Sequence, residues 1–196
     1  MRGKTVCLFI AMALLTVYAY GQQFEPEGNF RWERTGTGVT ITHYVGTNRD
    51  IRIPPQIQGM PVIGIGLGAF ARNHLTSVNI PDSFTYIGDN AFVDNQLTNV
   101  TIPASVTTIG NTVFSGNRLT NVSILGNDIL IGNFAFIGSR LTSIVIGNNV
   151  TITGVAPEAE QGIGNFHASF AQFYQNQGRR AGVYTFSNGR WGVQFR

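Results

Sequence analysis

Apolar and polar positions along the middle of this chain follow a pattern that returns every 22 residues. Residues 87–108 read IGDNAFVDNQLTNVTIPASVTT, and the next 22 residues read IGNTVFSGNRLTNVSILGNDIL. Four such copies fill residues 65–152 and share five apolar columns. The columns are Ile65, Ile87, Ile109 and Ile131; Phe70, Phe92, Phe114 and Phe136; Leu75, Leu97, Leu119 and Leu141; Val78, Val100, Val122 and Ile144; and Ile80, Ile102, Ile124 and Ile146. Because one unit of this length cannot bury its own apolar face, the pattern predicts copies that stack on one another.

The last three columns spell L-x-x-V-x-I, as in LTSVNI and LTNVTI, which is the strand signature of a leucine-rich repeat. Stacked copies place these strands about 4.8 Å apart in a parallel sheet along one side of a solenoid. On the opposite side, the x-x-A-F stretch has room for only one or two helical turns. We expect its phenylalanine to point inward as a core ladder rather than outward as an aromatic binding stripe. The predicted fold class is therefore a leucine-rich repeat solenoid that is mostly β.

The consensus I-G-x-x-A-F-x-x-N-x-L-T-x-V-x-I-P-x-S-V-T resembles the BspA-like class (type 5) of leucine-rich repeats, found in secreted and surface proteins of bacteria and some parasites. The preceding stretches GVTITHYVG and DIRIPPQIQGMPVIGIG also resemble the lead-in of those proteins. Copy three departs from the consensus at Leu125 and Asp128, and copy four has Gly147 in place of the proline. We expect the later coils to bend differently for this reason.

The chain divides into a leader, two caps and the repeats. Residues 1–21 have the charged start, apolar run and small-residue end of a secretory signal, and we expect cleavage after Gly21. Residues 22–64 are expected to form a β-rich N-terminal cap, because two runs in it alternate in polarity and predict a small antiparallel lead-in. These runs are Val39–Tyr44 and Ile51–Ile53.

Residues 153–196 are expected to form the C-terminal cap. Phe166, Phe170, Phe173 and Tyr174 lie on one stripe of an amphipathic helix, predicted at about 165–177 and ending near Gly178. The runs VYTF and WGVQF, joined through Asn188-Gly189, predict a β-hairpin at about 181–195.

Charge and cysteine content narrow the choice of partners and compartment. After removal of the signal, the chain has 11 arginines against 10 carboxylates, a net charge near zero. Its electrostatic potential therefore does not favour nucleic acid or an anionic membrane as a partner. The single cysteine, Cys7, lies within the signal, so the mature chain has no disulfide and no cysteine-based metal site. The expected location is secreted, cell-surface or periplasmic, with no membrane insertion after the signal is removed.

Residues that could perform catalysis are few and scattered. His43, His74 and His167 have no partner at ligand spacing. Four carboxylates fall in different columns of the repeat, and Glu158 and Glu160 lie in a poorly repeating stretch that predicts a loop. The four are Asp82, Asp89, Asp94 and Asp128. The sequence therefore predicts no enzyme, no cofactor and no metal site.

The outer face of the predicted sheet is the candidate binding surface. Strand side chains alternate between the two faces, so the residues that flank the buried valine and isoleucine of each copy point outward. One row is Ser77, Asn99, Asn121 and Ser143, and the other is Asn79, Thr101, Ser123 and Val145. A solenoid presents such a face to an extended partner rather than to a small molecule. The alternative is a soluble β-face without a partner, because binding hot spots are usually Trp, Tyr or Arg.

The resemblance implies an adhesin-type module that engages host matrix or plasma proteins or the surface of other cells. A second hypothesis is a structural or self-associating envelope protein. A glycan-binding module is disfavoured because the face has no aromatic platform for sugar rings. The repeat column Asn73, Asn95, Asn117 and Ser139 has a structural interpretation, in which the side chain satisfies backbone groups at the turn into the strand.

Overall fold

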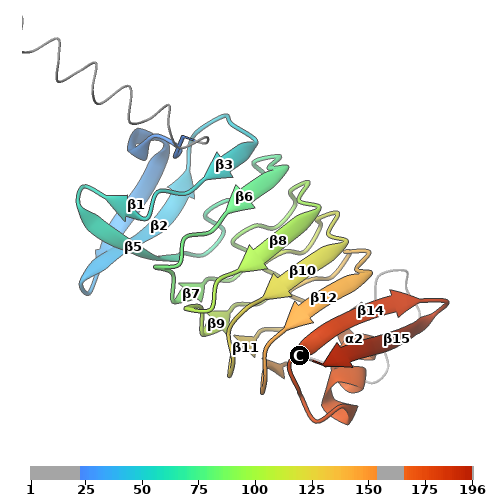
Figure 1. Cartoon of the computed structure of the whole chain (residues 1–196). Helices are drawn as coiled ribbons and strands as arrows, with labels where there is room; N and C mark the ends of the chain where they lie inside the picture. Colours follow the sequence, from blue (N-terminus) through green and yellow to red (C-terminus); the bar gives the residue numbers. More distant parts are fainter. Residues whose placement is uncertain (1–22, 154–165, 196) are drawn as a thin grey trace, which may run out of the picture.

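The computed structural model describes residues 23–153 and 166–195 as a stack of about five coils with a β-rich segment at each end (Figure 1). The predicted signal, residues 1–21, lies outside the described residues. The fold is a leucine-rich repeat solenoid, as the 22-residue pattern predicts. Its elements, in chain order, are η1 (Glu27–Asn29), β1 (Phe30–Thr35), β2 (Gly38–Tyr44), β3 (Asp50–Arg52), β4 (Gln56–Ile57), β5 (Met60–Ile65), β6 (Ser77–Asn79), β7 (Tyr86–Ile87), β8 (Asn99–Ile102), β9 (Thr108–Ile109), β10 (Asn121–Ile124), β11 (Leu130–Ile131), β12 (Ser143–Ile146), β13 (Thr151–Ile152), α2 (Phe166–Asn176), β14 (Gly182–Ser187) and β15 (Arg190–Phe195).

One side of the stack is the predicted row of L-x-x-V-x-I strands. β8, β10 and β12 pair in parallel and in register, with Val100 beside Val122 and Val122 beside Ile144. β14 then adds to β12 in the antiparallel direction, and β15 adds to β14, which completes a five-stranded sheet. The repeat therefore aligns equivalent residues of successive copies on neighbouring strands.

A second sheet, which the sequence analysis did not predict, lies on another side of each coil. Its strand order is β1-β2-β5-β7-β9-β11-β13, and its repeating members contain the isoleucine that precedes each conserved glycine. Close approach between coils requires glycine at positions 88, 110 and 132. A Cβ at Gly110 would lie 2.6 Å from the backbone nitrogen of Asp89, and one at Gly132 would lie 2.6 Å from the carbonyl carbon of Gly110. No side chain fits there, so the I-G pair marks a place where backbones touch.

The A-F stretches form the far side of each coil, where the expected short helical turns take the form of successive β-turns. Ala71 N–H donates to the Gly68 carbonyl and Val93 N–H to the Asn90 carbonyl, three residues back in each case. The chain also bonds to the next copy here, since Phe70 N–H donates to Ala91 and Phe92 N–H donates to Val113. Hydrogen bonds between coils therefore continue on this side without a helix.

The core is a ladder of stacked phenylalanines. Phe70, Phe92, Phe114 and Phe136 are buried, and neighbouring ring centroids are 5.0 to 5.4 Å apart with nearly parallel planes. Tyr44 stacks on Phe70 at 5.6 Å and closes the ladder at the N-terminal end. The core interpretation of this column is confirmed.

A buried asparagine ladder runs beside the phenylalanines. Asn95 Oδ1 accepts a hydrogen bond from Leu75 N–H at 2.9 Å, and its Nδ2 donates to the carbonyls of Phe70 and Phe92. Asn117 repeats the arrangement one coil later with Leu97, Phe92 and Phe114. These amides satisfy backbone groups of two successive coils, as the structural interpretation predicts. In copy four the ladder is broken, because the buried Ser139 Oγ has no hydrogen-bond partner among the described residues.

The N-terminal segment departs from the expected antiparallel lead-in at one point. β1 and β2 are antiparallel, but β3 pairs in parallel with β6 and places Ile51 beside Val78. β3 is thus a first rung of the solenoid, within residues that we expected to belong to the cap. The parallel pairing buries Ile51 and Ile53 against the first repeat. A hairpin of β3 with β2 would leave the apolar side chains at the start of the first repeat uncovered.

The C-terminal segment consists of helix α2 and the β14–β15 hairpin. Phe170 and Tyr174 of α2 are buried against the last coil, and Gly178, with a φ of +69°, ends the helix. Asn188 and Gly189 both have positive φ, which is the geometry of a two-residue hairpin turn.

Copy four is one residue shorter than the others at this end, since Ile131 pairs with Ile152 and not with residue 153.

Candidate binding face

The eight outward residues of the strand row form the candidate binding face, defined as Ser77, Asn79, Asn99, Thr101, Asn121, Ser123, Ser143 and Val145. The strand register brings them together in two rows, with Asn121 beside Asn99 and Ser143, and Ser123 beside Thr101 and Val145. The five residues on β6, β8 and the start of β10 are exposed, and the last three are half-buried. The face is therefore most accessible over the first three repeats.

Side-chain hydrogen bonds order one part of this face. Asn121 Nδ2 donates to Asn99 Oδ1 at 2.9 Å, and each asparagine also donates to the threonine before it in the chain. These bonds hold the amides in one orientation, which lowers the entropy cost of using them to bind a partner. The rest of the two rows consists of hydroxyl groups, one further amide and one aliphatic side chain, so the face can recognise a partner by shape and by neutral hydrogen bonds.

Sequence reasoning missed the N-terminal end of the two rows. The pairing of β3 with β6 places Asp50 beside Ser77 and Arg52 beside Asn79, so the rows begin with two charged residues. The signal was present in the sequence, because I-x-I-P at residues 51–54 matches V-x-I-P at 78–81 and 100–103. At the other end β14 places Thr185 beside Ser143 and Val183 beside Val145.

The described histidines and carboxylates lie apart from one another. His43 and His74 are exposed on different parts of the chain. Asp89 and Asp94 share one coil but lie in different columns of the repeat, and Asp82 and Asp128 lie on other coils. The side chain of His167 lies outside the described set, as do Glu158 and Glu160. Within residues 23–153 and 166–195, no three His, Cys, Asp or Glu side chains lie together in a way that could hold a metal ion.

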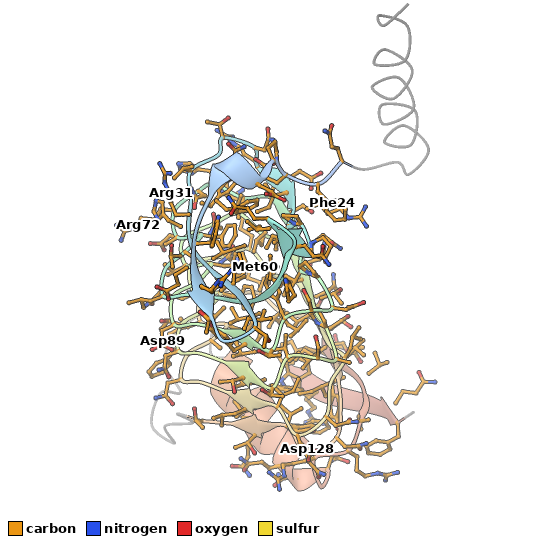
Figure 2. All side chains as sticks on the ribbon, turned by 90° about the vertical axis from the view of Figure 1, so that its left-hand side faces the viewer. Phe24, Arg31, Met60, Arg72, Asp89 and Asp128 are labelled. Atoms are coloured by element: carbon orange, nitrogen blue, oxygen red, sulfur yellow. The ribbon has the colours of Figure 1, made fainter. Side chains whose placement is uncertain are left out.

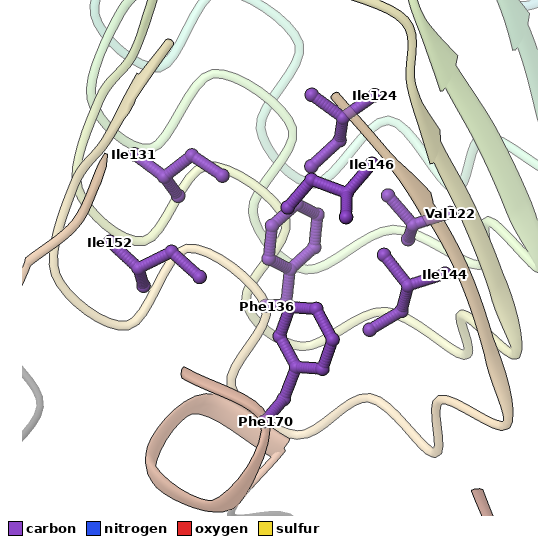
Figure 3. Close-up of a pocket in the computed structure, with 8 residues that line it drawn as sticks. All are labelled: Val122, Ile124, Ile131, Phe136, Ile144, Ile146, Ile152 and Phe170. Atoms are coloured by element: carbon purple, nitrogen blue, oxygen red, sulfur yellow. The ribbon is translucent and has the colours of Figure 1, made fainter. Parts of the chain in front are cut away.

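One small cavity lies between copies three and four and helix α2. Its volume is about 10 Å³, and Figure 3 shows its lining of aliphatic side chains with Phe136 and Phe170. An apolar space of this size is too small for a ligand and offers no polar partners to an ordered water.

The shifted pKa values belong to structural tyrosines. Burial raises the pKa of Tyr184 to about 12, and its hydroxyl donates to the Arg180 carbonyl at 2.8 Å. Burial, and next the hydrogen bond to Glu25, raise the pKa of Tyr44 well above its usual range. Both side chains secure the ends of the solenoid, and neither faces the candidate binding face.

Comparison with known proteins identifies the family. The family model described as "BspA type Leucine rich repeat region (6 copies)" matches residues 49–156. The chain belongs to the BspA-type leucine-rich repeat family. The start of the match at residue 49 agrees with the position of β3 as the first rung. The resemblance drawn from the consensus is confirmed.

A solved structure agrees with this assignment. The chain is similar to the leucine-rich repeat protein TpLRR of T. pallidum, with a TM-score of 0.52 and 27% identity over 57% of this chain and 54% of that chain. It also matches a leucine-rich cell surface protein of Faecalibacterium prausnitzii, with a TM-score of 0.34 and 20% identity over 89% of this chain and 62% of that chain. The chain thus spans less than two thirds of the length of both. Curated proteins gave no match. Among the described helices, none has the length and apolarity to cross a membrane.

Proposed function

We propose that the mature chain is an exported, non-enzymatic protein that binds another protein through the candidate binding face. The observation that carries this proposal is the register of β8, β10 and β12, which lines up amides and hydroxyls of successive coils on one surface. Leucine-rich repeat solenoids use extended surfaces of this kind for docking. The partner class is a host matrix or plasma protein, or the surface of another cell, in the manner of an adhesin. Export rests on the signal pattern of residues 1–21.

The test uses residues 22–196 as a purified chain and immobilised matrix or plasma proteins. The double variant Asn99→Arg and Asn121→Arg replaces two exposed amides on neighbouring strands with bulky charges. We expect it to weaken binding at least about tenfold, because about 1.4 kcal/mol is lost when a central contact is blocked. Its melting temperature should match that of the unchanged chain, since both side chains are exposed.

A matched control places the same residue type on the other sheet. Thr108→Arg lies on the exposed side of β9 and should leave binding unchanged. If the folded Asn99/Asn121 variant binds as well as the unchanged chain, the candidate binding face is not the binding site.

A second candidate function is a structural, self-associating protein. The observation in its favour is that β15 is an edge strand of the five-stranded sheet. A second chain can pair with the free backbone groups of an edge strand. Sedimentation should then show a mass that rises with concentration. A monomer at the highest attainable concentration would rule this candidate out.

A further inference from the structure

We propose that the arginines at the amino ends of β10 and β12, together with Arg190 on β15, form a basic edge that binds an acidic, extended protein segment. The basic edge is defined as Arg118, Arg140 and Arg190. It lies along one border of the candidate binding face, so this inference rests on the proposed function and specifies the chemistry of the partner.

The repeat places two members of the basic edge on successive coils. Arg118 N–H donates to the Leu97 carbonyl and Arg140 N–H donates to the Leu119 carbonyl, both at 2.9 Å, so the two backbones occupy equivalent positions. Their Cα atoms are therefore about one strand spacing, ~4.8 Å, apart. Both side chains are exposed. Like charges on neighbouring coils repel each other, and an anion bound between them would relieve that repulsion.

Arg190 continues the row on the hairpin. Phe186 N–H donates to the Thr142 carbonyl, and Ser187 pairs with Arg190, so Arg190 lies at the same end of the sheet as Arg140. Figure 1 shows the tails of the β10 and β12 arrows and the turn between β14 and β15 on the same side of the sheet. The three arginines thus cover about three strand steps, or ~14 Å, which matches about four residues of an extended chain.

An ion pair neutralises an arginine on the first coils, whereas the three arginines of the basic edge form none within the described residues. Arg72 projects from the flank of the stack (Figure 2), and its Nε lies 3.2 Å from Oδ2 of Asp94 on the next coil. Arg72 and Asp94 share one repeat column, whose members on the coils of Arg118 and Arg140 are Gly116 and Gly138, so no carboxylate occupies this column on those two coils. Asp94, on the coil before Arg118, is paired with Arg72. Within the described part of the chain, the members of the basic edge form no ion pair.

The charge of the whole chain follows the same division. Residues 22–110 contain seven carboxylates and five arginines, whereas residues 111–196 contain three carboxylates and six arginines. Beyond residue 110, the one acidic side chain in the described part of the chain is Asp128, which follows the carboxyl end of β10 and so lies across the sheet from Arg118. The edge is therefore positive along its length, with the acid on the opposite border.

A protein segment fits this edge better than a sulfated glycan. Guanidinium groups bind carboxylates with two parallel hydrogen bonds, and the adjacent amides and hydroxyls can pair with peptide groups. The candidate binding face has no aromatic side chain on which a sugar ring could stack. An acidic peptide lying across the strand ends would use both the charge of the edge and the polar rows beside it.

The experiment measures fluorescence anisotropy of a labelled 20-residue poly-L-glutamate with chain 22–196 at neutral pH and low salt. We expect binding that weakens about tenfold in the double variant Arg118→Gln and Arg140→Gln and that falls as salt is added. The control variant Arg31→Gln and Arg34→Gln removes the same charge from two exposed positions of β1 and should stay within about twofold of the unchanged chain. Melting temperatures verify that all variants fold.

Three results would overturn the inference. They are the absence of poly-L-glutamate binding by the unchanged chain, equal weakening in both double variants, and tighter arginine-dependent binding of a heparin oligosaccharide than of the peptide. Failure of the proposed function is distinguishable: it would appear as no capture of matrix or plasma proteins while the peptide still binds through Arg118 and Arg140.

Discussion

Copy two and copy four of the repeat have the same apolar columns but differ in their polar groups. Copy two has Asn95, which hydrogen-bonds backbone groups of two coils, whereas copy four has Ser139, whose buried hydroxyl has no partner among the described residues. Copy four is also one residue shorter after its strand, and it lines the small cavity beside α2. The comparison teaches that apolar columns are sufficient to form a coil, while the amide column determines how completely one coil satisfies the next.

The largest expected effect comes from removing a ring of the phenylalanine ladder. Phe92→Ala should lower the free energy of unfolding by about 3–5 kcal/mol, because Phe92 is fully buried between Phe70 and Phe114. Phe136→Ala should cost less, because its surroundings already contain a cavity and can relax more easily. Urea unfolding of both variants measures the difference, and equal costs would contradict the idea of a looser last coil.

The next effect concerns the asparagine ladder. Asn95→Ala leaves the buried Leu75 N–H and the Phe70 carbonyl without the amide, so we expect a loss of about 2–3 kcal/mol. Ser139→Ala should change stability by less than about 0.5 kcal/mol, because this hydroxyl makes no hydrogen bond to any described residue. Urea unfolding midpoints, with the dependence of the free energy on urea unchanged, measure both values. A large loss of stability in Ser139→Ala would contradict the view that copy four lacks this hydrogen-bonded position.

High pH should destabilise both ends of the stack. Below pH 10 tyrosine is protonated in the folded and the unfolded chain, so its contribution to stability is fully present. Above pH 10 the unfolded chain loses the proton while Tyr184 keeps it up to about pH 12, so the free energy of unfolding falls by at most ~1.4 kcal/mol per pH unit for such a group. Tyr184→Phe should make the decline between pH 10 and 12 less steep, as measured by thermal melts, and an unchanged slope would exclude this residue as the cause.

The smallest effect is a gain. Ser139→Asn restores the missing rung, with an amide positioned for Leu119 N–H and for the carbonyls of Phe114 and Phe136, as at Asn95 and Asn117. We expect an increase of about 1 kcal/mol, the net value of satisfying such groups. A rise in melting temperature of a few degrees verifies it. A loss of stability would mean that the shorter copy has no space for the amide.

Much of the fold could be read from spacing alone, and the limits of that reading have particular causes. The columns of Phe92 and Val100 repeat four times, so their placement in the core and in the strand row followed directly. The sheet containing β7 and β9 was missed because strands of two residues have too little alternation to be recognised. Asp50 and Arg52 were left out of the candidate binding face because β3 precedes the first regular copy at a different spacing: Ile51 pairs with Val78, a step of 78 − 51 = 27 residues instead of 22.

The sequence by itself determined that successive copies must stack, because each one has an apolar side it cannot cover alone. It also determined which residues point outward, since strand side chains alternate. Only the tertiary structure decided where the stack begins, how copy four meets the hairpin, and which of the described arginines forms an ion pair. The physical reason is that these depend on contacts between segments far apart in the chain, such as β3 with β6 and β12 with β14, which no local period encodes.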